Sequence, residues 1–339
     1  MKSILVTGGT GYIGSHTAVE LIQAGYNPII VDNLSNSDAA VISGINAIAN
    51  KDITWYKGDC RDDIFLRTVF EKHPEISGVI HFAAFKAVGE SVAEPLKYYD
   101  NNIGSLVQLL KTMNDFKVKN LVFSSSCTVY GQPSSLPVDE NCVHQLASSP
   151  YGYTKQVCEQ ILVDSGKANS EITNVILRYF NPIGAHPSGQ IGELPSGVPD
   201  NLVPYLTQVA SGEREKLTVF GSDYNTSDGT CIRDYIHVVD LAQAHVAALE
   251  WSEKNQGKCD HFNIGTGTGN SVQEVINSFE KINQIKLNVE YGARRDGDIE
   301  QIFASGEKAA RMLNWRAKMT LEDALKDAWN WQKKLKTPA

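Results

Sequence analysis

The first half of the chain alternates short, continuously apolar runs with longer stretches of helical spacing. The apolar runs lie at 4–6, 28–31, 79–82, 121–123 and 175–177. Apolar runs without polar alternation are typical of strands that are buried on both faces of a sheet. Helical spacing occupies 13–24, 63–72, 94–113 and 151–168. Strands that alternate with helices in right-handed crossovers predict an α/β fold with a Rossmann-type, doubly wound parallel sheet.

The pattern changes after residue 180, where a segment rich in proline and glycine begins. Such a segment is typical of a loop and of a domain boundary. Shorter elements follow, with helices expected near 201–211, 238–250, 271–284 and 307–313 and from 320, and strands near 217–220 and 260–264. We therefore expect a first domain over 1–180 and a smaller α/β C-terminal lobe over 181–339. Segments near 230–262 are expected to return to the first domain.

Composition and charge narrow the class of protein. The 339 residues are 42% hydrophobic and 21% charged, with a net charge of −8 and no basic stripe. This balance indicates a globular protein and excludes a nucleic-acid partner. Six scattered cysteines without metal-ligand spacing predict a reduced, cytoplasmic protein with no metal site. We expect no membrane association, because the N-terminus lacks a signal pattern and no run of about 18 apolar residues exists.

A glycine-rich turn follows the first strand and precedes the first helix. Gly9, Gly11 and Gly14 match GxGxxG, and Gly8 precedes them. Glycines here allow a tight turn and close approach to a pyrophosphate at a helix N-terminus. Asp32 ends the second strand, where a carboxylate accepts ribose hydroxyls, and the absence of a nearby arginine favours NAD over NADP. A purely structural turn and a capping aspartate are the alternatives.

A second constellation lies at the start of the predicted helix 151–168. Tyr151 and Lys155 are four residues apart and share one helix face. A nearby ammonium is expected to lower the pKa of Tyr151 and make the phenol a better base. Tyr153 has no such partner, because Val157 lies four residues on. A serine run at 124–126 ends the preceding strand, where ligands gather in such sheets.

These motifs resemble the extended short-chain dehydrogenase/reductase family, and within it the UDP-glucose (UDP-galactose) 4-epimerase branch. The resemblance covers the whole chain. It rests on GGTGYIGSHT at 8–17, DNLSNS at 32–37, HFAAFKAVGESV at 81–92, YYDNN at 98–102, SSSCTVYG at 124–131, SPYGYTK at 149–155, RYFNPIGAHPSG at 178–189, GTCIRDYIHVVDLA at 229–242 and RRDGD at 294–298.

The resemblance implies a mechanism and a set of site residues. Tyr151 would take a proton from the sugar 4-hydroxyl with help from Ser126, Lys155 would hold the nicotinamide ribose, and a transient 4-keto sugar would turn over beside bound NADH. The cofactor set is Gly8, Gly11, Tyr12, Ile13, Gly14, Asp32, Asn33, Asn36, Asp59, Cys60, Phe82, Ala83, Lys86, Asn101, Ser124, Tyr151, Lys155 and Tyr179. The UDP-sugar set is Lys86, Ser126, Tyr151, Asn181, Asn201, Leu202, Phe220, Arg233, Tyr235, Arg294, Asp298 and Gln301.

Several of these residues have structural alternatives. Phe82 and Tyr179 suit a hydrophobic core as well as a cofactor site, and Asp59 suits a turn as well as an adenine contact. Arg233 and Arg294 are expected to hold the diphosphate, or else to pair with their neighbours Asp234 and Asp296 respectively.

Two departures from the family pattern affect the expected chemistry. Cys127 follows the serine run as a small buried residue without a histidine to activate it. Gln301 is intermediate in size, which leaves acceptance of UDP-N-acetylglucosamine and UDP-N-acetylgalactosamine open.

Other functions on the same fold remain as alternatives. A nucleotide-sugar dehydratase would need Asp-Glu where this chain has Cys127-Thr128. A plain dehydrogenase would release reduced cofactor, and a non-catalytic NAD sensor would usually lack the tyrosine or the lysine.

The family also forms homodimers, and the helices 94–113 and 151–168 are the candidates for that contact. Four apolar residues supply surface for it or for the chain's own core: Leu106, Leu109, Leu110 and Met113.

Overall fold

The structure is a computed structural model that describes residues 1–295 and 298–336. Within these residues, its centre is a seven-stranded sheet in the order β11-β6-β5-β4-β1-β2-β3, with all neighbouring strands parallel. The strands are β1 (Ser3–Thr7), β2 (Asn27–Asp32), β3 (Thr54–Lys57), β4 (Ile76–His81), β5 (Asn120–Ser126), β6 (Thr173–Tyr179) and β11 (Cys259–Ile264). This confirms the predicted doubly wound α/β sheet.

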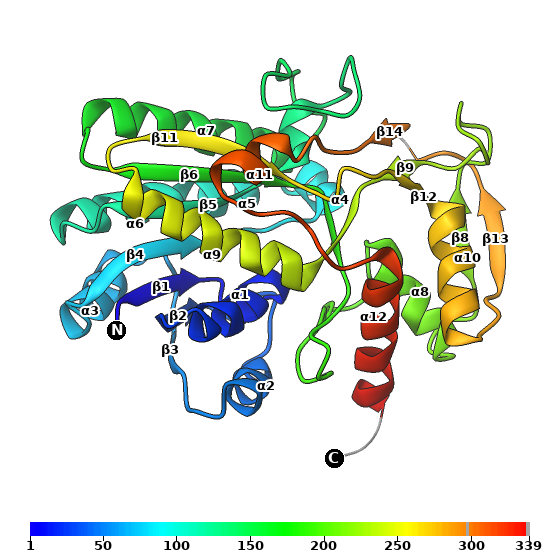
Figure 1. Ribbon diagram of the computed structural model, residues 1–339, viewed down its shortest axis with the longest axis horizontal. Helices are drawn as coiled ribbons and strands as arrows, with labels where there is room; N and C mark the ends of the chain where they lie inside the picture. Colours follow the sequence, from blue (N-terminus) through cyan, green and yellow to red (C-terminus); the bar gives the residue numbers. More distant parts are fainter. Residues whose placement is uncertain (296–297, 337–339) are drawn as a thin grey trace.

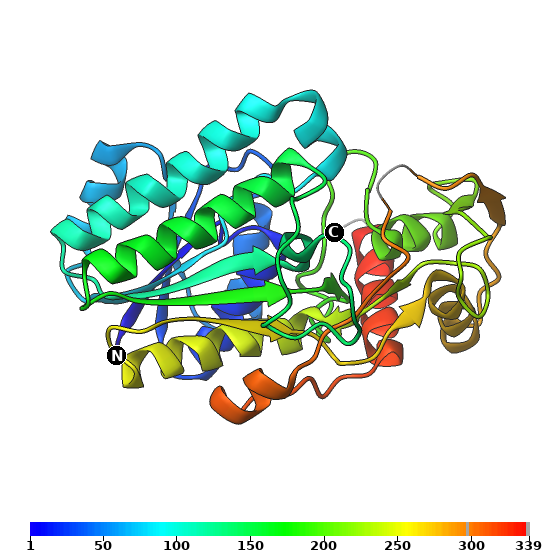
Figure 2. The same ribbon diagram turned by 90° about the horizontal axis from the view of Figure 1, so that it is seen from above.

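Helices cover both faces of the sheet (Figures 1 and 2). One face packs against α1 (Tyr12–Gln23), α2 (Ala40–Ala49), α9 (Val238–Lys254) and α11 (Glu307–Met312). The other packs against α3 (Asp63–Lys72), α6 (Gly104–Asp115) and α7 (Pro150–Ala168). Neighbouring residues of a strand serve opposite faces, as Val122 does for the first and Leu121 for the second. The strands therefore read as continuously apolar, because both faces are buried.

A smaller group of elements lies at the carboxyl end of the sheet (Figure 1). It contains α8 (Leu202–Ala210), α10 (Val272–Asn283), α12 (Leu321–Lys336), β8 (Leu217–Phe220) and β13 (Val289–Gly292), which share a hydrophobic core of their own. Short strands lie between the two groups: β7 (Asn181–Ile183) with β10 (Tyr235–His237), and β9 (Ile232–Arg233) between β12 (Asn270–Ser271) and β14 (Gln301–Ile302). β11 is a strand of the large sheet and α9 packs against that sheet, although both follow β7 and β8 in the chain.

The helical stretch predicted over 94–113 is confirmed, with a π-helical turn inside it and a separate short helix before it. The segment folds as α4 (Val88–Ala93), α5 (Pro95–Tyr98), a π-helical turn η1 (Tyr99–Ile103) and then α6. Pro95 lacks a backbone N–H and starts a new helix, which separates α5 from α4. A short 3₁₀ turn, η2 (Cys127–Tyr130), follows β5.

The apolar residues of α6 belong to the chain's own core. Leu106, Leu109 and Met113 have no exposed surface, and Leu110 is partly buried against the same cluster. These side chains fill the space between α6 and the sheet, so they supply no spare surface for a second copy of the chain.

Candidate active site at the carboxyl ends of the strands

The glycine loop joins β1 to α1 and lies very close to other backbone. Gly8 has a φ of 72°, and a Cβ atom on it would lie 2.7 Å from the backbone nitrogen of Ala83. A Cβ atom on Gly14 would lie 2.3 Å from the carbonyl oxygen of Gly8. Side chains are therefore excluded here. The Gly11 N–H donates to the carbonyl oxygen of Gly8 at 3.1 Å, and within the described residues no side chain caps α1. The N–H groups of Tyr12 and Ile13, the first two residues of α1, are thus open to an anion.

Asp32 lies beside this loop at the end of β2. Its buried carboxylate accepts hydrogen bonds from the backbone N–H of Thr10 at 3.1 Å and of Leu34 at 2.9 Å, and from the Ser37 hydroxyl at 3.0 Å. These bonds are those of a turn aspartate, and they also fix the carboxylate next to the glycine turn. Asp32 can therefore stabilise the turn and also offer its carboxylate to a ribose, so the two interpretations of this residue do not exclude each other.

The end of β3 lies next to the end of β2. Asn33 donates to Asp59 at 3.1 Å, and Arg61 pairs with the same carboxylate at 2.8 Å. The hydrogen bond from Arg61 is the main reason why the pKa of Asp59 falls to about 2. Cys60 is buried, which raises the pKa of its thiol to about 12, whereas Asn36 is exposed. The carboxylate of Asp59 thus already has hydrogen-bond partners within the chain, Asn33 and Arg61.

The loop after β4 approaches the glycine loop from the other side. The Phe82 N–H donates to the carbonyl oxygen of Thr7 at 3.0 Å, and the Phe82 ring lies 4.7 Å from that of His245. Lys86 forms an ion pair with Glu193 at 3.2 Å. Phe82 is therefore partly a core residue, whereas Lys86 reaches toward the smaller group of elements.

Asn101 and Asn102 lie buried in the π-helical turn η1. Asn101 donates to the side-chain oxygen of Asn102 at 3.0 Å. Asn102 bonds to the backbone N–H and C=O of Phe85 and to the Thr154 hydroxyl of α7. Asn102 thus ties the loop after β4 to α7, a role that its place in the motif YYDNN did not reveal.

The predicted catalytic residues come together where β5 ends and α7 begins. The Ser149 hydroxyl accepts from the N–H of Gly152 at 3.2 Å and caps the helix. Ser126, Tyr151 and Lys155 are buried, with 8%, 9% and 3% of their surfaces exposed. The Lys155 ammonium donates to the carbonyl oxygen of Ser124 at 2.6 Å and lies 6.0 Å from the centre of the Tyr151 ring.

A second tyrosine lies on the neighbouring strand. The hydroxyl of Tyr179, at the end of β6, is 2.5 Å from the Ser124 hydroxyl. Tyr179 packs partly against the core around α9, and burial raises its pKa to about 12. Tyr179 therefore combines a core position with a polar contact at the site.

The pKa values differ from the sequence expectation. Burial, together with Tyr179, raises the pKa of Tyr151 well above its ordinary value, while a hydrogen bond with Ser126 acts in the opposite direction. Burial also lowers the pKa of Lys155 to about 8. Desolvation of the phenol dominates here and the ammonium bonds to the Ser124 carbonyl oxygen, so the lowering of the Tyr151 pKa by Lys155 stays a prediction.

The predicted diphosphate arginines lie among the short strands and loops near the smaller group. Arg233 lies 3.9 Å from Asp298 and donates to the carbonyl oxygen of Ile232 at 2.9 Å. Arg294 pairs with Asp223 at 2.7 Å, and its guanidinium lies 4.1 Å from the centre of the Tyr224 ring.

The neighbour pairings expected for the two arginines have different outcomes. The pairing of Arg233 with Asp234 is wrong, because Asp234 is buried and accepts from Thr266, Gly267 and Ala304. Asp296, the expected neighbour of Arg294, lies outside the described residues together with Gly297.

Four other predicted substrate residues border the same region. Asn181 and Tyr235 face each other across β7 and β10, and burial raises the pKa of Tyr235 to about 12. Phe220 is exposed, with the Arg295 guanidinium 5.1 Å from the centre of its ring. Gln301 lies on β14 and donates to the carbonyl oxygen of Asn225 at 3.3 Å.

Glu193 is a residue of this region that sequence patterns did not single out. It accepts from Lys86 at 3.2 Å and from Asn201 at 2.8 Å, and its carbonyl oxygen accepts from Trp331 at 2.8 Å. Asn201 precedes α8, which begins at Leu202. Glu193 thus joins the loop after β4 to α8 and α12. Its only signal in the sequence was a charge within a loop rich in glycine and proline.

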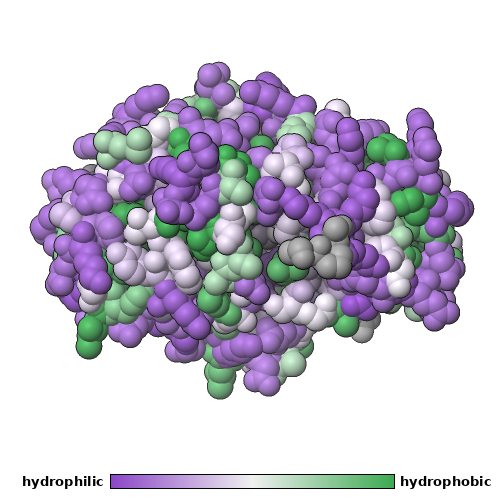
Figure 3. Space-filling model, turned by 90° about the horizontal axis from the view of Figure 1, so that it is seen from below, coloured by the Kyte–Doolittle hydropathy of each residue, from purple (hydrophilic) through white to green (hydrophobic). Residues whose placement is uncertain are grey.

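Two negative findings apply to residues 1–295 and 298–336. No helix there is long and apolar enough to cross a bilayer, and no three His, Cys, Asp or Glu side chains gather as metal ligands would. The face seen in Figure 3 is mostly hydrophilic, with apolar side chains in small separate groups.

Comparisons with known proteins agree with this geometry. The model of the NAD dependent epimerase/dehydratase family matches residues 4–265. A UDP-glucose 4-epimerase of Bacillus subtilis is 52% identical over 97% of this chain and 96% of its own. A UDP-glucose 4-epimerase from Bifidobacterium longum, solved in complex with NAD+ and UDP, has a TM-score of 0.95 and 46% identity over 98% of both chains.

A third relative has nearly the same fold. The UDP-glucose-4-epimerase from Stenotrophomonas maltophila, with bound NAD and formylated UDP-arabinopyranose, has a TM-score of 0.96 and 46% identity over 99% of both chains. Because the family model covers more than half of the chain and these relatives cover nearly all of it, the chain belongs to the NAD dependent epimerase/dehydratase family.

Proposed function

We propose that the protein interconverts UDP-glucose and UDP-galactose by inverting carbon 4 of the sugar, with NAD as a bound cofactor. The observation that carries the proposal is the joint burial of Ser126, Tyr151 and Lys155 at the carboxyl end of β5, in the same parallel sheet whose strand β1 leads into the glycine loop. The proposal is supported by the UDP-glucose 4-epimerases that match this chain over nearly its full length.

The residues of the first domain fit NAD. The cradle at Gly8 and Gly14 admits backbone but no Cβ atom, and the N-terminus of α1 lies open behind it. Asp32 offers acceptor oxygens where a ribose would lie. We assign the cofactor to the eighteen residues named for it above. When bound, NAD supplies a hydride acceptor and donor and a positively charged ring.

The chain's own side chains move the proton. In the proposed reaction Tyr151 removes the proton from the sugar 4-hydroxyl and later returns it, with the Ser126 hydroxyl between them. A tyrosine with a raised pKa holds its proton, so removal of the sugar's proton needs positive charge nearby. Lys155, buried within 6.0 Å of the Tyr151 ring, supplies that charge once its ammonium turns from the Ser124 carbonyl.

The diphosphate needs cations in a chain of net charge −8. Arg233 and Arg294 are proposed to hold it, because guanidinium groups bind phosphate oxygens bidentately. Arg294 is paired with Asp223 in this structure, whereas Arg233 donates to the carbonyl oxygen of Ile232 and has Asp298 at 3.9 Å. We infer that the UDP-sugar replaces these partners, and that Asn181, Asn201, Leu202, Phe220, Tyr235, Gln301 and Lys86 border it.

Product analysis tests the proposal. The purified protein is incubated with UDP-galactose and, separately, with UDP-N-acetylgalactosamine, without added NAD. We expect UDP-glucose from the first. The second incubation tests whether Gln301 leaves space for an acetamido group. Conversion of neither substrate would overturn the proposed function.

A matched pair of tyrosine variants tests the proton transfer. Y151F is expected to lower kcat by about 100- to 10,000-fold, the range for loss of a general acid–base group, while bound NAD is retained. Y153F is the control, because Tyr153 lies on the same helix turn and is exposed. Equal turnover of Y151F and Y153F would exclude Tyr151 as the proton-transfer residue.

We further propose that two copies of the chain associate through the face of α4, α5 and α7. Three apolar residues there, Val88, Val92 and Leu96, are exposed, and Tyr99 contacts Tyr153 edge to face. Both α4 and α5 contact α7. Sedimentation of the wild-type protein and V92D tests this face, with a monomeric wild type as the contrary result.

The domain division and the location are also proposals. Residues 1–180, with the return near 230–262, are assigned to NAD, and the remainder of 181–339 to the nucleotide sugar. A cytoplasmic location is supported by six free cysteines.

A further inference from the structure

A row of buried polar side chains crosses the sheet beneath α7. Ser125 of β5, Arg178 of β6 and Asn263 of β11 are register partners on adjacent strands. All three are buried, and the carboxylate of Glu159, from α7, lies over the row. The faces of a parallel sheet are usually apolar, and burial of polar groups costs free energy. A row of buried polar residues is therefore expected to have a specific role.

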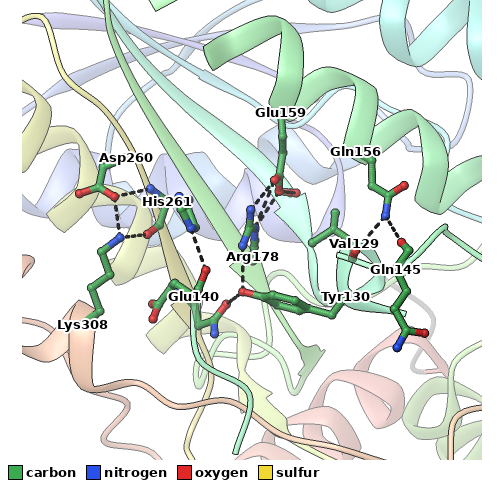
Figure 4. Close-up of polar contacts among 12 residues, drawn as sticks. Val129, Tyr130, Glu140, Gln145, Gln156, Glu159, Arg178, Asp260, His261 and Lys308 are labelled. Carbon is green, nitrogen blue, oxygen red and sulfur yellow. Dashed lines mark hydrogen bonds and ion pairs between the residues drawn. The ribbon is translucent and has the colours of Figure 1, made fainter. Parts of the chain in front are cut away.

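The contacts of Glu159 are short and numerous (Figure 4). Its Oε1 accepts from the Ser125 hydroxyl at 2.5 Å and from Arg178 Nε at 3.0 Å, and its Oε2 accepts from Arg178 Nη2 at 2.6 Å. Arg178 Nη1 also donates to the Tyr130 hydroxyl at 3.0 Å, which donates to Asn263 at 2.6 Å. Every arm of the guanidinium therefore has a partner.

These contacts lie next to the residues proposed for proton transfer. Glu159 follows Lys155 by four residues and Tyr151 by eight, so all three share one face of α7. Ser125 stands between Ser124, whose carbonyl oxygen accepts from Lys155, and Ser126. One carboxylate thus fixes both the rotation and the axial position of α7 against the strand that carries the serines.

A buried ion pair gives little net stability compared with apolar packing, but it can specify one geometry. We propose that Glu159, held by Arg178 and Ser125, is a positioning residue that sets Tyr151 and Lys155 at reacting distance from Ser126. This proposal rests on the proposed epimerase function. It assigns an active-site role to a buried carboxylate that the sequence motifs did not single out.

The charge of Glu159 has a second effect on the same lysine. The Lys155 ammonium faces the Phe123 ring and the Ser124 carbonyl of β5, His81 of β4, and Tyr151, Cys158 and Glu159 of its own helix. Burial lowers its pKa, whereas Glu159 and Cys158 act to raise it. Removing the carboxylate charge should therefore let Lys155 lose its proton at a lower pH.

Two variants separate length from charge. E159Q keeps the length and removes the charge, whereas E159D keeps the charge but is too short to reach both Ser125 and Arg178. In E159Q we expect kcat for UDP-galactose to fall about 10-fold or more, with KM little changed. The alkaline limb of its pH profile, where kcat falls at high pH, should shift to lower pH by about one unit. In E159D kcat should fall while the limb stays in place.

The matched control is D260N, which breaks the ion pair of Asp260 on β11 with Lys308 on α11. Asp260 lies on β11, the strand next to β6 (Figure 4), and its hydrogen bonds go to Lys308 and to the N–H of His261 rather than to α7. D260N should keep the wild-type kcat and pH profile. Equal kinetics of E159Q and D260N, or an unmoved alkaline limb in E159Q, would overturn the proposal.

Two further measurements test the proposal if E159Q does not fold or if the protein does not convert UDP-hexoses. If E159Q does not fold, S125A removes one hydrogen bond and no charge, and should lower kcat about 3- to 10-fold, with unchanged kcat as the contrary result. If the wild type converts no UDP-hexose, the proposed function fails and amide exchange decides on Glu159. Faster exchange over 150–158 in E159Q than in D260N supports the positioning role, and equal exchange refutes it.

Discussion

Lys155 is expected to reduce the stability of the protein at neutral pH, so its removal should stabilise the fold. The residue is 3% exposed, and its ammonium donates to the Ser124 carbonyl oxygen at 2.6 Å. Burial lowers the pKa from 10.5 to about 8. K155M replaces the charged side chain with an apolar one of similar length, which suits the neighbouring Phe123 ring.

The magnitude follows from the pKa shift. A shift from 10.5 to about 8 corresponds to about 3 kcal/mol of lost stability while the lysine is charged in both states. The lost hydrogen bond to Ser124 offsets about 1 kcal/mol of the gain. K155M should therefore be about 2 kcal/mol more stable than the wild type at pH 7, although it loses the proposed proton transfer.

The pH dependence has a definite sign. Between about pH 8 and 10.5 the unfolded chain keeps the Lys155 proton and the folded chain releases it. Wild-type stability from this group therefore rises with pH across that window, by up to about 1.4 kcal/mol per unit. The advantage of K155M should be full below pH 8, gone near pH 9.5 and reversed by about 1 kcal/mol near pH 10.5, while groups common to both proteins cancel.

Urea unfolding at a series of pH values measures this difference. The control is K167M on the same helix, because Lys167 is mostly exposed and should change stability by about 0.5 kcal/mol or less. A K155M protein that is less stable than the wild type at pH 7 would refute the reasoning. So would a difference that stays constant from pH 8 to 10.5.

Three further predictions test the fold around the site. G8A should lose bound NAD, because Gly8 has a positive φ and a Cβ atom on it would lie 2.7 Å from the Ala83 nitrogen. G212A is the control and should keep NAD, because Gly212 also has a positive φ but faces open space. The amount of nucleotide released when each protein is denatured measures the difference. L109A should lower the free energy of unfolding in urea by about 2–5 kcal/mol, and a loss below about 1 kcal/mol would contradict its complete burial. D234A should leave the backbone N–H groups of Thr266, Gly267 and Ala304 unpaired and cost about 3 kcal/mol or more, seen as a lower Tm, with an unchanged Tm as the contrary result.

The sequence was most informative where physical constraints are local. The buried strands follow from continuous apolar runs, and Tyr151 and Lys155 share a face because their spacing matches the helical repeat. Asp32 ends β2 where an apolar run gives way to polar residues. In each case the signal lies within a few residues of the feature that it predicts.

The features that could not be predicted depend on distant partners. Nothing near Asn102 indicates that it bonds to Phe85 and Thr154, and this contact lies in the π-helical turn that interrupts the expected helix. Arg294 pairs with Asp223, 71 residues away. The strands β9, β12 and β14 have two residues each, too few to show any periodicity.

Two helices on the same face of the sheet show how the site departs from ordinary packing. α6 contributes Leu106, Leu109 and Met113 to the core, as an amphipathic helix should. α7 contributes Leu162 and Cys158 to the same cluster, but toward the carboxyl ends of the strands its buried residues become Glu159, Lys155 and Tyr151. An apolar set in these positions would remove a buried ammonium and a buried ion pair, and would stabilise the protein. The weaker amphipathic pattern of α7 is therefore what a helix should show when Tyr151, Lys155 and Glu159 on its buried face have the roles proposed above.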